Sequence, residues 1–197
     1  MNISMLKKCY RMNVLLNKFP QKIRIDDTDF EIKTDFRNCL KIILAYEDTE
    51  LTIQEKHYIL LQRLYKTIPN NIEEAIRKGI SFLNCGKEDS DENSLKKRIY
   101  SFDKDYQYIY SAMNQTHNID LESIEYLHWW KFVFYFMDVS KDCTFSFIVS
   151  LRDKKNKGKL DKEEKKVWAE MIEILDLNFN EEEDEEENEF MRKFNES

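Results

Sequence analysis

The sequence predicts a mainly α-helical protein: an orthogonal bundle of six or seven helices, with a small N-terminal β-hairpin and a disordered acidic C-terminal tail. Three observations support this class. Only three Gly and two Pro occur in 197 residues, too few for a many-turned β fold. Apolar residues recur at helical spacing through most of the chain. Residues 129–137 read Trp-Trp-Lys-Phe-Val-Phe-Tyr-Phe-Met, and eight of these nine are apolar or aromatic.

The segment 129–137 is expected to be a buried central helix. A surface helix keeps about half its circumference polar, so a helix that is apolar on all sides must be enclosed by neighbours or by lipid. Nine helical residues span roughly 13 Å, far short of the ~30 Å core of a bilayer. Trp129 and Trp130 point about 100° apart on a helix. We therefore expect the two rings to pack against different partners.

A β-hairpin is predicted before the first helix. Period-two runs at 22–25 and 30–32 flank the turn-forming cluster Asp26-Asp27-Thr28-Asp29. An isolated hairpin is only marginally stable in water. We therefore expect its apolar side to lie on the helical body; that side consists of Ile23, Ile25, Phe30 and Ile32.

Three helices are expected to follow the hairpin. The first starts after Thr34 or Asp35, either of which is a suitable N-cap. Its predicted buried stripe is Phe36, Leu40, Ile43 and Leu44. The second begins with a capping box formed by Thr52 and Glu55 and is expected to run as far as Pro69. The third follows Asn71, and its Gly79 is expected to allow a close helix crossing.

The second half of the chain is expected to contain the remaining helices. Residues 84–98 are mostly polar and lack any apolar periodicity, which predicts an exposed linker. One helix is expected from about Phe102, Asp120 is expected to cap the central helix, and Thr144 is expected to open a short one. A capping signature at Asp161 and Glu164 predicts the last helix, which ends near residue 175.

The predicted domain organisation is a single helical domain at 13–179, between an N-terminal extension at 1–12 and an acidic tail at 180–197. A division into two lobes would fall in the 84–98 linker. Eight of the nine residues at 181–189 are acidic, and removing these eight from the net charge of −7 leaves +1 for the rest. A body so nearly neutral argues against a nucleic-acid-binding surface. Beyond this block, Phe190 and Phe194 are candidate partner-binding residues.

The basic run at 152–159 has two interpretations. It carries five positive residues against one acid. The simpler interpretation is a solvated loop between helices. The other is a surface that meets the acidic tail or an acidic partner, through contacts that salt would weaken because the Debye length is only about 8 Å at physiological ionic strength.

No residue pattern predicts catalysis, a metal site or a cofactor. His57, His117 and His128 lack the spacing of a zinc hydrolase motif. The three Gly are too dispersed for a phosphate-binding loop. The four Cys form no Cys-x-x-Cys pair, which favours unpaired thiols in a reducing cytoplasm. We therefore expect a protein that is not an enzyme and that binds neither nucleic acid nor membrane.

Short motifs along the chain resemble a known protein family. The most specific is Tyr126-Leu-His-Trp-Trp-Lys-Phe132. The others, in order, are Asn13-Val-Leu-Leu, Phe30-Glu-Ile, Thr34-Asp-Phe-Arg, Phe82-Leu-Asn-Cys-Gly, Phe102-Asp-Lys-Asp, Tyr108-Ile-Tyr, and a Phe-x-x-Ile that leads to Leu151-Arg152. Over residues 13–175 the chain resembles the tail-assembly proteins of long-tailed phages and prophages of Gram-positive bacteria, a family named for a numbered gene product. The residues assigned to family motif or core are Phe36, Tyr110, His128, Trp129, Trp130, Phe132 and Arg152.

The resemblance implies a non-enzymatic assembly chaperone. Such proteins are thought to bind the tape measure protein, together with other tail assembly proteins, and to keep it soluble while the tail forms. This role implies action in the host cytoplasm and absence from the mature virion. Two alternatives remain: a structural tail component retained in the virion, and an acidic phage inhibitor of a host nucleic-acid enzyme.

Overall fold

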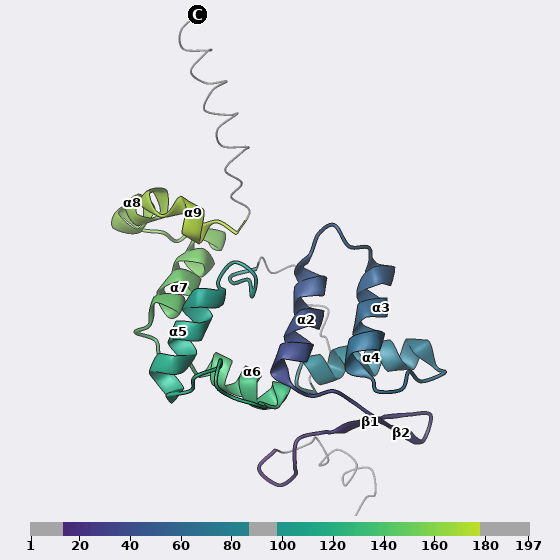
Figure 1. Cartoon of the computed structure of the whole chain (residues 1–197). Coiled ribbons are helices and arrows are strands. Elements are labelled where there is room, and N and C mark those ends of the chain that lie inside the picture. The colour runs from purple at the N-terminus through teal and green to yellow at the C-terminus, as the bar shows by residue number, and fades with distance from the viewer. Residues whose placement is uncertain (1–13, 87–97, 178–197) are drawn as a thin grey trace, which may run out of the picture. The chain divides into compact units, whose positions relative to one another are not determined.

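A computed structural model describes residues 14–86 and 98–177 of the chain. Within these residues the protein is mainly α-helical, with eight helices and one two-stranded antiparallel sheet near the N-terminus (Figure 1). The predicted fold class is confirmed. The predictions for the N-terminal extension, for most of the 84–98 linker and for the acidic tail with Phe190 and Phe194 lie outside the described residues.

The chain folds as two compact units, each made of two separate stretches of sequence. Unit 1 comprises the described residues of 14–86 and 120–138, and unit 2 those of 98–119 and 139–177. The elements of unit 1 are β1 (Lys22–Ile25), β2 (Thr28–Glu31), α2 (Phe36–Glu47), α3 (Ile53–Leu64), α4 (Ile72–Leu83) and α6 (Trp129–Met137). Those of unit 2 are α5 (Tyr106–His117), α7 (Thr144–Asn156), α8 (Lys162–Glu170) and α9 (Ile172–Leu175).

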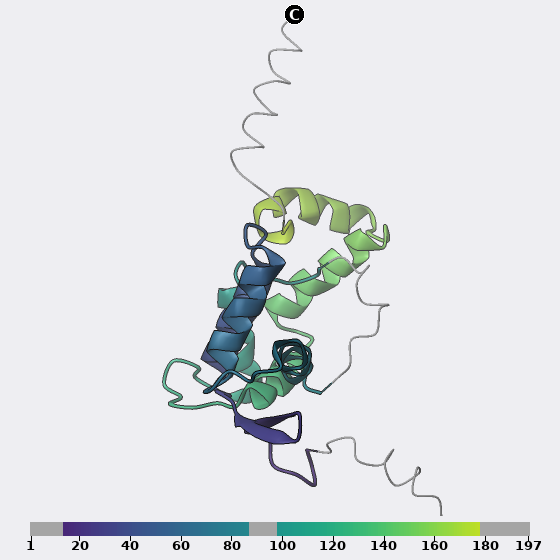
Figure 2. The ribbon, with the colours of Figure 1, turned by 90° about the vertical axis from the view of Figure 1, so that its right-hand side faces the viewer.

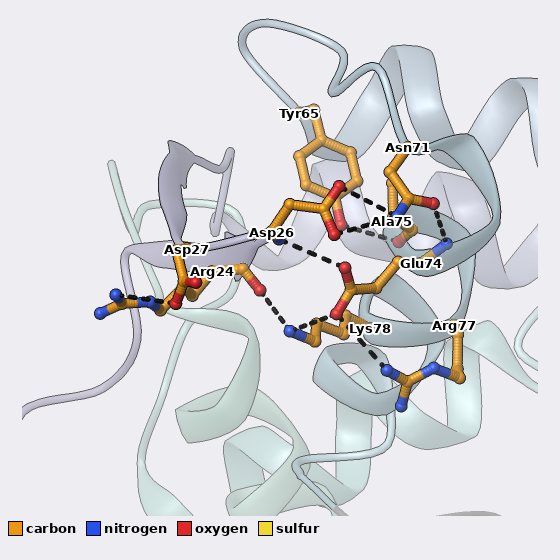
Figure 3. A network of polar contacts seen from close by, with 9 residues as sticks. All are labelled: Arg24, Asp26, Asp27, Tyr65, Asn71, Glu74, Ala75, Arg77 and Lys78. Carbon is orange, nitrogen blue, oxygen red and sulfur yellow. Dashed lines mark hydrogen bonds and ion pairs between the residues drawn. The ribbon is translucent and has the colours of Figure 1, made fainter.

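The hairpin closes through a two-residue turn at Asp26 and Asp27. Their φ angles are 43° and 62°, a region that Asp tolerates better than most residues. The Asn71 side chain donates a 3.0 Å hydrogen bond to the Asp26 carboxylate, and the Asp26 backbone N–H donates to Glu74 (Figure 3). Lys78 Nζ binds Glu74 at 2.7 Å and holds the pKa of that carboxyl below 4.5. These contacts fasten the turn to the start of α4, so the hairpin lies on the helical body as expected.

Local caps start the first three helices of unit 1 where the sequence places them. Asp35 caps α2, Thr52 and Glu55 form the capping box of α3, and Asn71 caps α4. In Figure 1, α2 and α3 run side by side, while α4 runs across α3 rather than along it; Figure 2 shows the same arrangement after a 90° turn. An alanine Cβ at position 79 would lie 2.8 Å from Leu60 Cδ2. The close crossing predicted at Gly79 is therefore confirmed.

Two details of unit 1 differ from prediction. The buried residues of α2 are Phe36, Cys39, Ile42 and Ala45. Leu40, Ile43 and Leu44 are only half-buried, because α3 and α6 approach α2 from the neighbouring side. The α3 helix ends at Leu64, well before Pro69. It ends there because Tyr65 pairs with Ile32 and donates its hydroxyl to the Ala75 carbonyl at 2.7 Å.

In unit 2, α5 and α7 pack side by side (Figure 1). The α5 helix begins at Tyr106, a turn later than expected, because residues 102–105 form a turn. The α7 helix has Cys143 as N-cap and runs 13 residues to Asn156. The interpretation of 152–159 as a loop is therefore wrong for its first half. Asp161 and Glu164 form the predicted capping box of α8, and the expected last helix is interrupted at Met171 before α9.

Candidate protein-binding surface

His128 fixes the start of α6. Its side chain caps the helix by accepting a hydrogen bond at Nδ1 from the Trp130 backbone N–H, at 3.1 Å. The proton of the neutral ring is therefore on Nε2, which donates to the Pro20 carbonyl at 3.0 Å. Phe19 stacks on the imidazole with 4.8 Å between ring centroids. Burial lowers the pKa of His128 below 6.5, while the hydrogen bond to Pro20 acts in the opposite direction.

The expectation that Asp120 caps α6 is wrong. The helix begins nine residues later, at Trp129. Asp120 instead accepts a 3.0 Å hydrogen bond from the Glu122 backbone N–H in a local turn. Sequence reasoning missed His128 as the cap because the usual N-cap residues are Ser, Thr, Asp and Asn.

Trp129 and Trp130 form hydrogen bonds with backbone carbonyls at the end of α4. Their indole N–H groups donate to the carbonyls of Leu83 and Phe82, each at 2.8 Å. The last carbonyls of a helix lack partners within the helix, so two side chains of α6 complete the hydrogen bonding of α4. The rings themselves have different neighbours, as expected: Trp129 stacks on Phe132, and Trp130 stacks on Phe82.

An aromatic stack joins α6 to α2. Phe132 lies between Phe36 and Phe136, with centroid separations of 4.9 and 6.4 Å. The Arg37 guanidinium covers the Phe36 ring at 4.6 Å and donates to the carbonyls of Leu121 and Ile124, both at 2.7 Å. The inner face of α6 is thus held firmly in unit 1.

The described residues leave one side of α6 only partly covered, so the prediction that neighbours enclose this helix on all sides is wrong. Phe134 is 36% exposed, with its ring centroid 6.0 Å from that of Phe19, and Met137 is 66% exposed. Lys131, one turn before Phe134, is also exposed. We call these three residues the α6 outer face. The buried residues of α6, which make the contacts with α2 and α4 described above, are Trp129, Trp130, Phe132 and Phe136.

The predicted residue Arg152 lies in unit 2, where it pairs with Asp105. The two side chains are 3% and 1% exposed. Sequence reasoning listed Arg152 but not its partner, although Asp105 closes the motif Phe102-Asp-Lys-Asp that was singled out. Tyr110 departs from its core assignment, because it remains 39% exposed while Ile109, Ala112 and Met113 occupy the inner face of α5.

Two buried cysteines have structural positions. Cys39 is fully buried, and burial raises its pKa strongly, with Asp35 and Cys85 adding to the effect. The Cys143 thiol caps α7. Among residues 14–86 and 98–177, no group of three or more His, Cys, Asp or Glu side chains is placed to hold a metal ion.

No helix in the described part of the chain combines the length and the apolar character needed to span a bilayer.

Comparison with known proteins identifies the family. No curated protein and no solved structure shows significant similarity to the chain. The family model described as "Bacteriophage Gp15 protein" matches residues 15–177, which include both structural units. The matched region thus contains the His128-Trp129-Trp130 junction in unit 1 and the Asp105–Arg152 pair in unit 2. The chain belongs to the bacteriophage Gp15 protein family.

Proposed function

We propose that this phage protein is a non-enzymatic tail assembly factor that binds the tape measure protein and keeps it soluble during tail morphogenesis. In this proposal it acts in the host cytoplasm, works with other tail assembly proteins and is released before the virion matures. Membership of a phage protein family supports the setting. The motifs around Trp129 and Trp130, which resemble tail-assembly proteins, support the specific role.

The α6 outer face is the observation that carries the proposal. Eight of the nine residues of α6 are apolar or aromatic, yet in the described structure Phe134 and Met137 remain exposed. An exposed apolar surface on a rigid element is a typical protein-binding feature. A long helical client presents apolar stripes of its own, and helices bind such stripes through a few anchor residues at i and i+3 spacing. Phe134 and Met137 have this spacing.

The contact also has to be reversible, since tail-tube subunits must replace the chaperone. Small interfaces bind weakly and exchange readily. The α6 outer face presents two large apolar side chains and one lysine, which suits a contact of this kind. Many copies along one extended client would compensate for the weakness of each contact.

Co-expression with the tape measure protein of the same phage tests the proposal. The variant Phe134→Ser/Met137→Ser removes both anchors. The control Ile53→Ser/Tyr58→Ser changes two exposed apolar residues of α3 in the same unit. We expect the α6 variant to weaken binding of the tape measure protein about tenfold, or about 1.4 kcal/mol, and so to reduce the soluble protein that co-purifies. The control should retain wild-type levels, and both variants should keep the wild-type thermal midpoint.

The outcomes separate the surface from the function. Equal losses in both variants, or no loss in either, would reject the α6 outer face as the binding surface. A wild-type protein that does not keep the tape measure protein soluble would reject the chaperone function itself. Mass spectrometry of purified tails tests the structural alternative, because stoichiometric presence of the chain would make it a component of the virion.

A further inference from the structure

Unit 2 carries a cleft that the proposed function does not use. It has a volume of about 450 Å³ and is lined by Lys155 from α7, Lys165 and Trp168 from α8, and Gly158 and Leu160 between the two helices. Lys155 Nζ lies over the Trp168 ring, 5.2 Å from its centroid. The lining thus combines two cationic groups with an aromatic face and an aliphatic side chain. Such a lining suits an acidic peptide that also carries apolar residues.

The acidic side chains near the cleft already form ion pairs or cap a helix. Residues 152–168 contain eight basic and four acidic side chains. Glu164 pairs with Lys154, Asp153 with Lys157, and Glu163 with Lys166. The fourth acid, Asp161, caps α8. Within the described residues, Lys155 and Lys165 form no ion pair, so both lysines of the cleft are available to a further anion.

We propose that this cleft binds the chain's own acidic segment, residues 181–194. Eight of the first nine residues of that segment are acidic, and Phe190 and Phe194 follow them. Carboxylates would meet Lys155 and Lys165, and a phenylalanine would meet Trp168 and Leu160. The charge and the apolar content of the segment therefore both match the lining of the cleft.

The position of the chain before this segment favours an intramolecular contact. Leu175 is fully buried in a cluster against which the cleft residues Leu160 and Trp168 pack. The acidic block begins six residues after Leu175, a reach of up to roughly 20 Å at about 3.3 Å per residue. A connection of this length gives an effective concentration in the millimolar range. A contact that would be weak between separate molecules is thus favoured within one chain.

This contact would act as a built-in competitor. An acidic segment of another protein reaches the cleft only by displacing residues 181–194. Because the attraction is largely electrostatic and exposed, it weakens as salt shortens the Debye length from about 8 Å at physiological strength to about 3 Å at 1 M. The inference is independent of the α6 outer face, which lies in unit 1.

Nuclear magnetic resonance of the full-length chain tests the inference. The tail-neutral variant replaces the acids of 181–189 with Gln or Asn. We expect the Trp168 indole N–H and the amides of 155–168 to shift between this variant and the wild type, while the Trp129 and Trp130 indoles stay unchanged. Raising the salt to 1 M should move the wild-type signals toward the variant positions. Unchanged Trp168 and 155–168 signals would overturn the inference.

Matched charge reversals distinguish the cleft from the general basic surface. The variant Lys155→Glu/Lys165→Glu should abolish the tail-dependent shifts. Lys159→Glu/Lys162→Glu makes the same change in net charge outside the cleft lining and should preserve them. Equal loss in both variants would show attraction without a docking site and would contradict the inference. Shifts that grow with protein concentration would assign the occupant to a second copy, which also contradicts it.

A synthetic peptide of residues 181–194 provides a direct binding measurement. It should bind the tail-neutral variant about tenfold more tightly than the wild type, whose cleft the attached segment already fills, a difference of about 1.4 kcal/mol. Equal affinity for the two proteins would contradict occupation of the cleft in the wild type.

Discussion

Arg152 and Asp105 form a buried, two-bonded ion pair in unit 2. Arg152 Nη1 lies 2.6 Å from Asp105 Oδ2, and Nη2 lies 3.0 Å from Oδ1. The guanidinium also donates to the carbonyls of Leu175 at 2.8 Å and Ile174 at 2.7 Å. Asp105 accepts a further hydrogen bond from the Ser101 backbone N–H at 2.9 Å. One ion pair thus connects α7 to the start of α5 and to α9.

Removing one member of this pair should be strongly destabilising. We expect Asp105→Asn or Arg152→Met to lower the free energy of unfolding by about 3–5 kcal/mol, because each change leaves a buried polar or charged group without its partner. The double variant Asp105→Leu/Arg152→Met should cost less than the sum of two single apolar substitutions. Urea denaturation measures these values. As a control, Lys157→Ala breaks an exposed ion pair with Asp153 and should cost at most about 1 kcal/mol. If the double variant costs the sum of the two single variants at 105 and 152, the two side chains are not coupled.

Trp130 should stabilise the fold both through the packing of its ring and through the hydrogen bond of its N–H group. Trp130→Ala should cost about 3–5 kcal/mol, close to the stability of a small folded unit. Trp130→Phe keeps an aromatic ring but removes the indole hydrogen bond to the Phe82 carbonyl, which still accepts from the Cys85 backbone N–H, so the cost should be about 0.5–1.5 kcal/mol. Thermal and urea unfolding measure both. Trp168→Phe is the control. If it lowers the free energy of unfolding as much as Trp130→Phe does, the loss at Trp130 is not due to its hydrogen bond to α4.

Gly79→Ala should destabilise unit 1 although alanine is the better helix former. The new methyl group would overlap Leu60, and overpacking of a buried site costs about 1–3 kcal/mol, against a gain of about 1 kcal/mol in helix propensity. A Leu60→Ala background removes the closest overlap and leaves only Leu64 Cδ2, at 3.1 Å, so the same substitution should cost less there. An identical cost in both backgrounds, measured by urea denaturation, would contradict the steric explanation.

His128 should make unit 1 less stable at mildly acidic pH. Its pKa is below 6.5 in the folded protein and returns to about that value on unfolding, so the unfolded chain binds the proton more readily. Stability is therefore complete above pH 6.5 and declines as the pH falls toward the folded pKa. His128→Asn retains an N-cap acceptor and should flatten this part of the stability curve. Nuclear magnetic resonance titration of the imidazole provides the direct check, and a folded pKa at or above 6.5 would refute the argument.

The sequence by itself determined the class of fold and the starts of several helices. Caps act over two or three residues, so Asp35, Thr52, Asn71 and Asp161 are readable without a tertiary structure. The hairpin turn was predictable for the same reason, because it too depends only on neighbouring residues. Gly79 was also predictable, because a lone glycine within a helical pattern indicates a close approach.

The tertiary structure decided what depends on distant residues. The pairing of Asp105 with Arg152 spans 47 positions, and the indole bonds of Trp129 and Trp130 span 46 and 48. The open side of α6 could not be predicted either, because an apolar helix has the same sequence whether neighbours enclose it or cover one face. Periodicity shows which residues share a side of a helix, but only packing determines which side is covered and which remains available to a partner.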